Sequence, residues 1–209
     1  MNNIDTDQSI TPTTVYPGGI EVFENIWLEP HKTIITLEKE CENANTAMHW
    51  ERSDVKGIDG YSGYGEARTN LEIKLTEIAE AGDQFSQALH NQIADMMDDI
   101  TISYMIRHKI YGIKYHHEFY HILKYSNDQK FDAHVDGMPG GNRFLSAILY
   151  LNDDYEGGEL EFINFNLKLK LKPGSLIVFP SYFSYAHTAH PVTAGNKYAI
   201  VAWLGLGNI

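Results

Sequence analysis

Two histidine-containing patterns in the second half of the chain have the residue types and the spacing of metal sites. HEFYH, residues 117–121, matches the H-E-x-x-H pattern, in which two histidines on one face of a helix hold zinc and the glutamate acts as a base. HVD, residues 134–136, places an imidazole and a carboxylate two residues apart. Which of the two patterns can close a metal site largely decides the chemistry of the chain.

HEFYH needs a helix, but its surroundings predict a strand. Aromatic and branched residues, which suit a pleated surface, lie in and around it: Tyr111, Tyr115, Phe119, Tyr120, Ile122, Leu123 and Tyr125. On a strand, His117 and His121 would lie roughly 13 Å apart, which is too far for one ion. We therefore expect these histidines and His116 to be surface or hydrogen-bonded residues. A zinc protease that depends on Glu118 is a minor alternative.

HVD suits the strand that its surroundings predict. Because side chains alternate along a strand, His134 and Asp136 would point to the same side and could converge on one ion. His187 and His190 lie downstream, and Lys197 follows at the start of the last predicted strand. Two histidines and one carboxylate form the ligand set of non-haem Fe(II) oxygenases, which leaves three coordination positions open. A lysine close to that set would neutralise the carboxylate of an organic co-substrate.

The first half of the chain predicts a mainly helical support region over residues 19–109. Ile34, Leu37 and Cys41 lie three and four residues apart, as the apolar stripe of a helix does. A longer stripe with the same spacing begins near Asp83. These stripes predict helices that pack against the rest of the molecule.

A glycine-rich segment, GIDGYSGYGEA at residues 57–67, lies between the two predicted helices. It contains too much glycine for regular structure. It is either a plain loop or a lid that presents Tyr61 and Tyr64 to a substrate.

From residue 110 the chain predicts short strands separated by turns. FLSAILYLN and SLIVF are apolar runs, LKLKLK at 167–172 alternates without a break, and KYAIVAWL closes the chain. About seven or eight such strands with no helical pattern between them indicate an antiparallel sandwich or jelly roll. We expect one integrated domain of class α+β, with a mobile arm at 1–18, the helical region at 19–109 and a β core at 110–209.

Composition limits the partners and the compartment. The formal charge of −12, from 28 acidic and 16 basic residues, disfavours a nucleic-acid substrate. No apolar run approaches the roughly 18 residues of a membrane span, and the polar start lacks the pattern of a secretory signal. Cys41 is the only cysteine, so no internal disulfide can form, and a reducing, cytoplasmic location is expected.

The stretch from Tyr125 to Trp203 resembles the catalytic core of the prolyl 4-hydroxylase-like Fe(II)/2-oxoglutarate dioxygenases. The motifs that carry the resemblance are Y-x8-H-x-D, R-x6-YLN, GGE-x-x-F, KPGSLIVFP, H-x3-PV, GNKY and the final W. In this sequence they fall at Tyr125, His134, Asp136, Arg143, 150–152, 157–159, Phe162, 172–180, His187, 191–192, 195–198 and Trp203. The ordered combination is highly specific, whereas the first half of the chain is similar to the family only in general character.

The resemblance implies a double-stranded β-helix, or jelly roll, in which His134, Asp136 and His187 hold Fe(II). His187 fits the distal ligand better than His190, because it stands four residues before Pro191, as the family's ligand does. His190 is then a polar residue at the rim or a group behind the ligands.

The resemblance also implies that Lys197 binds the distal carboxylate of 2-oxoglutarate, helped by the hydroxyls of Tyr125 and Tyr150. Tyr150 could instead simply fill the barrel. The chain departs from the family pattern in GGELEF, with Leu160 where many members have threonine. This change removes one hydrogen bond, worth about 0.5–1.5 kcal/mol net, from the expected co-substrate contacts.

The implied activity is hydroxylation of a C–H bond with O2 and 2-oxoglutarate, which releases succinate and CO2, with ascorbate as a candidate accessory reductant. The expected substrate is a prolyl residue in a peptide or protein, with Arg143 and Trp203 at substrate-contacting positions. Arg143 could equally be a solvated charge. Asp136 argues against a halogenase, which leaves that ligand position free for chloride. Oxidation of another amino-acid residue or a small molecule, and a non-catalytic jelly-roll binding protein, are the alternatives.

Overall fold

The computed structural model describes residues 10–44, 46–56, 62–63, 65–137 and 141–207, and every structural statement below concerns these residues. The helices are α1 (Pro30–Glu42), α2 (Leu75–Glu80) and α3 (Gln84–Arg107), with 3-10 turns η2 (Pro17–Gly19), η3 (Ile163–Phe165) and η4 (Phe183–Tyr185). The strands up to residue 134 are β1 (Thr14–Tyr16), β2 (Ile20–Phe23), β3 (Glu51–Arg52), β4 (Val55–Lys56), β5 (Ser62–Gly63), β6 (Leu71–Lys74), β7 (Tyr115–Ser126) and β8 (Phe131–His134). The later strands are β9 (Arg143–Tyr150), β10 (Glu156–Gly157), β11 (Leu160–Phe162), β12 (Leu167–Leu169), β13 (Leu176–Pro180), β14 (His187–Ala189), β15 (Val192–Ala194) and β16 (Asn196–Leu206).

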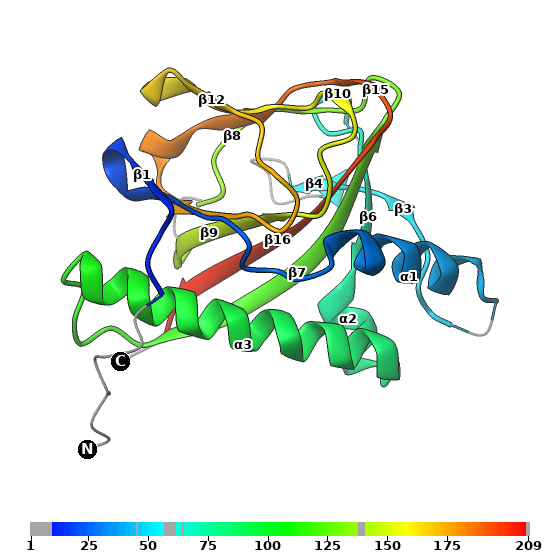
Figure 1. Cartoon of the computed structure of the whole chain (residues 1–209), viewed down its shortest axis with the longest axis horizontal. Helices are drawn as coiled ribbons and strands as arrows, with labels where there is room; N and C mark the ends of the chain where they lie inside the picture. Colours follow the sequence, from blue (N-terminus) through cyan, green and yellow to red (C-terminus); the bar gives the residue numbers. More distant parts are fainter. Residues whose placement is uncertain (1–9, 45, 57–61, 64, 138–140, 208–209) are drawn as a thin grey trace.

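Two antiparallel sheets form the centre of the molecule. The main sheet has the strand order β1-β2-β13-β9-β16-β7-β6-β3, and a smaller sheet has the order β12-β11-β14-β8. Figure 1 shows the smaller sheet over one face of the main sheet and α3 running across the opposite face. This arrangement confirms the predicted jelly roll with helices packed against it. We call the face toward the smaller sheet the inner face and the face toward α3 the outer face.

Helix α3 covers the outer face because its apolar stripe meets apolar strand residues. Asp83 begins the helix by accepting a hydrogen bond from the Ser86 amide (2.8 Å). Ile93 and Met97 of the helix are buried in one core with Ile122 of β7. The stripe that begins near Asp83 is therefore a helix face, as the sequence predicted.

The predicted strands of the second half are present, with two differences in length. HEFYH lies inside β7, and the runs FLSAILYLN, SLIVF and KYAIVAWL correspond to β9, β13 and β16. The alternating run at 167–172 pairs only over Leu167–Leu169, and β8 ends at His134, before the HVD pattern is complete. Alternation thus located these strands but did not fix where each one ends.

Part of the expected mobile arm is a paired strand. Within residues 10–18, β1 pairs antiparallel with β2, and Arg107 of α3 donates a hydrogen bond to the Ile10 carbonyl (2.7 Å). The run at 14–16 is prone to β structure but too short to be recognised from its pattern. The region 19–109 likewise supplies β2, β3 and β6 to the main sheet in addition to its three helices.

Candidate active site

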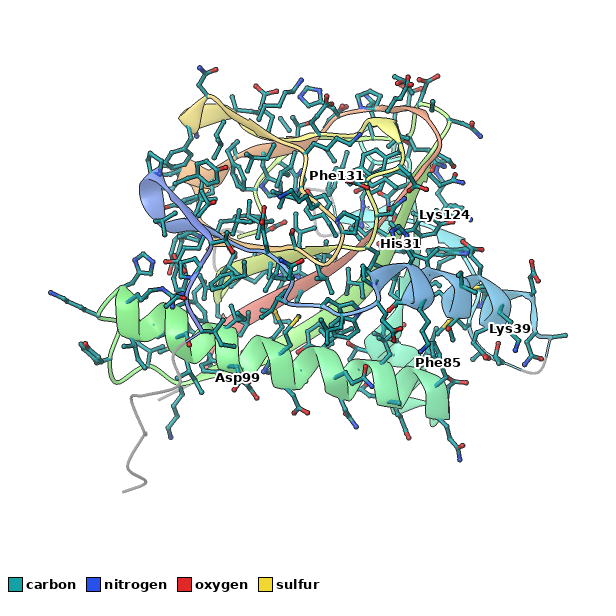
Figure 2. The ribbon with its side chains drawn as sticks, in the orientation of Figure 1. His31, Lys39, Phe85, Asp99, Lys124 and Phe131 are labelled. Carbon is teal, nitrogen blue, oxygen red and sulfur yellow. The ribbon has the colours of Figure 1, made fainter. Side chains whose placement is uncertain are left out.

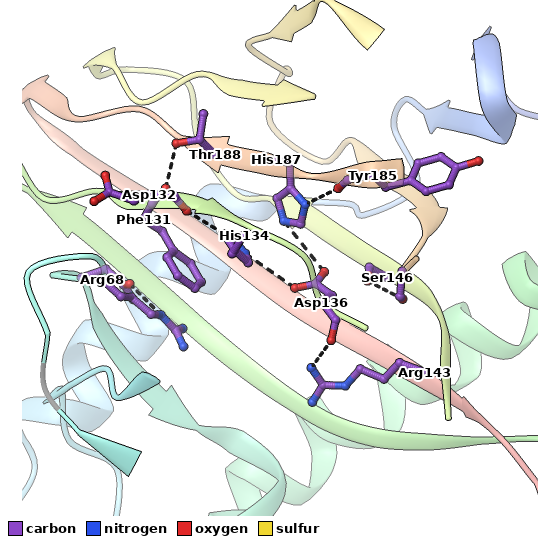
Figure 3. Close-up of polar contacts among 12 residues, drawn as sticks. Arg68, Phe131, Asp132, His134, Asp136, Arg143, Ser146, Tyr185, His187 and Thr188 are labelled. Carbon is purple, nitrogen blue, oxygen red and sulfur yellow. Dashed lines mark hydrogen bonds and ion pairs between the residues drawn. The ribbon is translucent and has the colours of Figure 1, made fainter. Parts of the chain in front are cut away.

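His134, Asp136 and His187 meet between the two sheets. His134 ends β8 and His187 begins β14, and the two residues are direct partners in that strand pair. Asp136 lies in a bend beyond β8, and this bend brings its carboxylate to the imidazoles (Figure 3). Its Oδ1 is 3.6 Å from His134 Nε2, and its Oδ2 is 3.9 Å from His187 Nε2. One ligand atom from each residue lies within 4.8 Å of the others, which fits a single divalent cation.

Backbone carbonyls fix the tautomers of both histidines. His134 Nδ1 donates to the carbonyl of Asp132 (2.8 Å), and His187 Nδ1 donates to the carbonyl of Tyr185 (2.9 Å). Each neutral ring then carries its lone pair on Nε2, the atom that faces Asp136. A partner of this kind on the far nitrogen is what orients a metal-binding imidazole.

The protonation states of Asp136 and His134 also suit a metal. Burial raises the pKa of the Asp136 carboxyl, but the two imidazoles and two hydrogen bonds outweigh burial and hold this pKa below its ordinary value. Those hydrogen bonds come from Ser146 and Trp203. Burial lowers the pKa of His134 to about 4. At neutral pH the carboxylate is therefore charged and His134 is neutral, as metal binding requires.

A buried lysine forms the floor of the same cavity. Lys197 is 3% exposed, and its Nζ donates to the carbonyl of Gly158 (2.7 Å). The ring centroids of Tyr125 and Tyr150 lie 5.3 and 5.1 Å from this Nζ. Burial lowers the pKa of Lys197 to about 7 and raises the pKa of Tyr125 to about 12. Lys197, Tyr125 and Tyr150 line one cavity with the three metal-site residues.

One polar atom of this cavity lacks a partner. The buried hydroxyl of Tyr150, which lines the cavity, has no hydrogen-bond partner among the described residues. Because a buried polar group without a partner costs roughly 1–3 kcal/mol, such atoms commonly mark where a ligand binds. Leu160 lines the cavity with an apolar side chain, so the hydroxyl expected there in many relatives is missing. The floor fits a carboxylate, and the metal-site residues fit the cation beside it.

Comparisons with known proteins agree with this geometry. Residues 120–205 match the model of the 2OG-Fe(II) oxygenase superfamily. A PKHD-type hydroxylase of Prochlorococcus marinus (strain MIT 9301) is 30% identical over 175 residues, which cover 80% of this chain and 71% of the relative. The chain belongs to the 2OG-Fe(II) oxygenase superfamily.

Solved prolyl hydroxylases share the fold of this oxygenase. One from Trichoplax adhaerens, in complex with a hypoxia inducible factor peptide fragment, matches with a TM-score of 0.72 at 16% identity, over 90% of this chain and 84% of that one. A prolyl-4-hydroxylase of Pseudomonas putida matches with a TM-score of 0.64 at 17% identity, over 92% and 95%. Together with the family match, these relatives confirm the predicted prolyl hydroxylase-like Fe(II)/2-oxoglutarate dioxygenase.

Trp203 lines the oxygenase cavity, and Arg143 packs on its ring. The guanidinium carbon of Arg143 lies 4.4 Å from the centre of the Trp203 ring. Arg143 Nε donates to Glu118 Oε2 (2.6 Å), and its NH1 donates to the carbonyl of Asp136 (3.3 Å). Arg143 is therefore paired rather than merely solvated. Tyr61 and Tyr64, predicted as lid residues, lie outside the described residues.

The other candidate histidines of the oxygenase lie away from the three metal-site residues. His117 Nε2 donates to Asp98 Oδ1 (2.8 Å), and its Nδ1 is hydrogen-bonded to the Tyr120 hydroxyl. His190 Nε2 donates to Glu161 Oε2 (2.6 Å) at the rim. HEFYH is thus a stretch of hydrogen-bonded strand, as its surroundings predicted.

Of the helices in the described ranges, none has the length and apolar content that a bilayer crossing needs.

Sequence reasoning missed one residue of the oxygenase cavity that comes from the first half of the chain. Arg68 lies just before β6, is 9% exposed and lines the same cavity as His134. Nothing in the local pattern EARTNLEIK distinguishes it from a surface arginine. Its backbone bridge to Phe131 and the pairing of β6 with β7 bring it to the site.

Proposed function

We propose that this oxygenase holds Fe(II) with His134, Asp136 and His187 and hydroxylates a prolyl residue in a peptide or protein. The observation that carries the proposal is a single cavity with a preoriented ligand set at one end and a buried lysine at the other. Bound Fe(II), with O2 and 2-oxoglutarate, supplies the oxidising power for C–H hydroxylation, and the co-substrate leaves as succinate and CO2.

The residues around the ligands keep the site ready for the cation. The imidazoles of His187 and His134, followed by Ser146 and Trp203, lower the pKa of Asp136 and hold it as a carboxylate. Backbone carbonyls keep the two Nε2 lone pairs directed at it. No large rearrangement is then needed when the metal binds. Such preorganisation lowers the cost of binding.

Lys197 and Tyr150 supply donors for the distal carboxylate of 2-oxoglutarate. Lys197 Nζ carries three N–H groups, and one of them is used on the Gly158 carbonyl. The Tyr150 hydroxyl is buried without a partner among the described residues and faces the same cavity. The walls between the two ends include Ile148, Leu160 and other apolar side chains, which exclude water and strengthen the charge interaction.

The prolyl substrate is supported by the relatives and by two stacked side chains beside Asp136. The indole of Trp203 and the guanidinium of Arg143 pack on one another and present flat surfaces there. A ring such as that of proline packs well on a flat aromatic surface. The cytoplasmic location and the use of ascorbate stay proposals that follow from the single cysteine and from the chemistry of ferrous iron.

Mass spectrometry of peptides tests the substrate. The protein is incubated with proline-containing peptides, Fe(II), ascorbate and 2-oxoglutarate, and each peptide has a matched control with alanine at the proline. We expect a gain of one oxygen on proline, with succinate formed in equal amount and both lost in Asp136→Ala. Succinate formation coupled to an oxygen on another residue, or on no peptide, would contradict the prolyl assignment.

A further inference from the structure

A buried ion cluster lies beside the metal site and is contributed mainly by the first half of the chain. Arg68 NH2 and Glu72 Oε2 are 3.0 Å apart, and His121 Nδ1 donates to the same carboxylate oxygen (3.2 Å). Arg68 also donates to Asn70 Oδ1 (3.1 Å) and to the carbonyl of Asp54 (3.2 Å). Glu72 is 0% exposed. The guanidinium is therefore held in one orientation from three sides.

One side of this cluster reaches a candidate metal ligand through an aromatic ring. The guanidinium carbon of Arg68 lies 4.9 Å from the centre of the Phe131 ring. That ring stacks on the His134 imidazole, with centroids 3.5 Å apart and planes 12° from parallel. Guanidinium, phenyl and imidazole thus form one stack that ends at the metal site (Figure 3). Arg68 and Phe131 are also joined by a backbone bridge, so both their side chains and their backbones hold the two residues together.

The other side of the cluster reaches a second aromatic side chain of the cavity. The His121 ring meets the Trp203 indole nearly at a right angle, 87° with centroids 5.6 Å apart. Trp203 in turn lines the same cavity as Asp136. The cluster therefore contacts two aromatic side chains of the cavity, and one of them, Phe131, stacks on a proposed ligand.

Burying these charges costs free energy, so the presence of the cluster calls for an explanation other than stability. Taking an ion pair out of water costs several kcal/mol per ion, and replacing such pairs with apolar residues is often neutral or stabilising. Arg68 and Glu72 also precede the region 120–205 that matches the superfamily model, so that match gives them no role.

The His134 ring needs a constraint that its hydrogen bond does not provide. The bond from Nδ1 to the Asp132 carbonyl acts within the ring plane. Rotation about the last side-chain torsion of histidine is soft, so this bond alone leaves the tilt of the ring loosely defined. A phenyl ring stacked on its face restricts that tilt, and the guanidinium on the far face of Phe131 keeps the phenyl ring in place.

We infer that Arg68 is a positioning residue: acting through Phe131, it fixes the plane of the His134 imidazole and thereby raises the affinity of the site for its divalent cation. The inference rests on the proposed role of His134 as a metal ligand. It gives the first half of the chain a part in metal binding, although it contributes none of the three proposed ligands.

Titration with Co(II) alone tests the inference without turnover. The absorption of bound Co(II) reports ligand geometry, and the titration gives the dissociation constant. Phe131→Leu removes the stacked ring, and Arg68→Lys keeps the positive charge against Glu72 but loses the planar face. Phe131→Tyr keeps an aromatic ring at this position. Phe85→Leu, on α3 and far from Phe131 (Figure 2), is the matched control for loss of a phenyl group.

We expect Phe131→Leu to raise the Co(II) dissociation constant about tenfold and to change the absorption, as loss of groups behind metal ligands commonly does. Arg68→Lys should weaken binding by a smaller factor, with Phe131→Tyr and Phe85→Leu close to the parent protein. If the Phe131→Leu variant is folded and keeps the affinity and spectrum of the parent protein, the inference is overturned. If Asp136→Ala fails to bind Co(II) in the same experiment, the proposed function still stands. Parent-like binding by Arg68→Lys would overturn the role of Arg68. A parent protein that binds no Co(II) would overturn both proposals.

Discussion

The two faces of the main sheet treat polar groups differently. On the outer face, His117 uses both ring nitrogens, one on Asp98 and one on Tyr120. Glu38 of α1 likewise accepts hydrogen bonds from Lys124 (2.8 Å) and Tyr198 (2.7 Å). These side chains satisfy one another and help to fix the helices on the sheet.

On the inner face, polar groups are buried and left available. The Nε2 atoms of His134 and His187 face a carboxylate but carry no proton to donate to it, because each ring places its proton on Nδ1. The Tyr150 hydroxyl has no partner among the described residues. The comparison teaches that the informative property of a buried histidine is the partner of its second nitrogen. A histidine with both nitrogens paired is structural, whereas one with a free lone pair among other free groups marks a site.

The strongest test of this comparison removes one candidate ligand from the inner face. In His187→Ala or Asp136→Ala we expect Co(II) binding and succinate formation to fall by more than about 100-fold, because two ligands hold a cation far less well than three. His117→Gln on the outer face should leave both unchanged. Undiminished succinate formation in either inner-face variant would refute the ligand assignment.

A second, intermediate effect concerns pH and Lys197. Burial lowers the pKa of the free lysine to about 7, so the empty site holds a charged lysine below that pH and a neutral one above it. A carboxylate binds the charged form, so 2-oxoglutarate affinity should be flat below about pH 7 and fall about tenfold for each unit above it. Calorimetry on the Co(II)-loaded protein measures this affinity.

Lys197→Arg is the control for the pH effect, because a guanidinium stays charged through the whole range. Its 2-oxoglutarate affinity should show no such fall. An equal fall in the arginine variant would place the titrating group elsewhere.

The smallest predicted effect belongs to the outer face. His117→Gln loses part of the hydrogen bonding between β7 and α3, so the free energy of unfolding should drop by about 1 kcal/mol. Urea denaturation measures this change. Metal binding that weakened tenfold in the same variant would contradict the division between the two faces.

The sequence predicted those parts of the molecule that are governed by local pattern. The alternating and apolar runs located β7, β9, β13 and β16, and the stripe after Asp83 located α3. The ordered motifs from Tyr125 to Trp203 picked out the cavity residues His134, His187 and Lys197, which the fold brings together.

Features that depend on contacts between distant segments were not predictable. Asp136 reaches the imidazoles through a bend after the strand has ended, although alternation along a strand predicted the same convergence. Arg68 becomes part of the cavity through its bridge to Phe131 and the pairing of β6 with β7, and no spacing within the sequence encodes these contacts. Residues 14–16 pair with the neighbouring β2, but that run is too short to be recognised from its pattern.

The direct pairing of His134 with His187 across β8 and β14 links chemistry to the mechanics of the smaller sheet. Side chains on a strand alternate between faces, so sliding one of these strands by a single residue would turn one imidazole to the opposite side. A cation bound to both rings would resist that sliding and act as a clasp between the two strands. The ion that the reaction requires would then also stabilise the strand register on which its own binding depends.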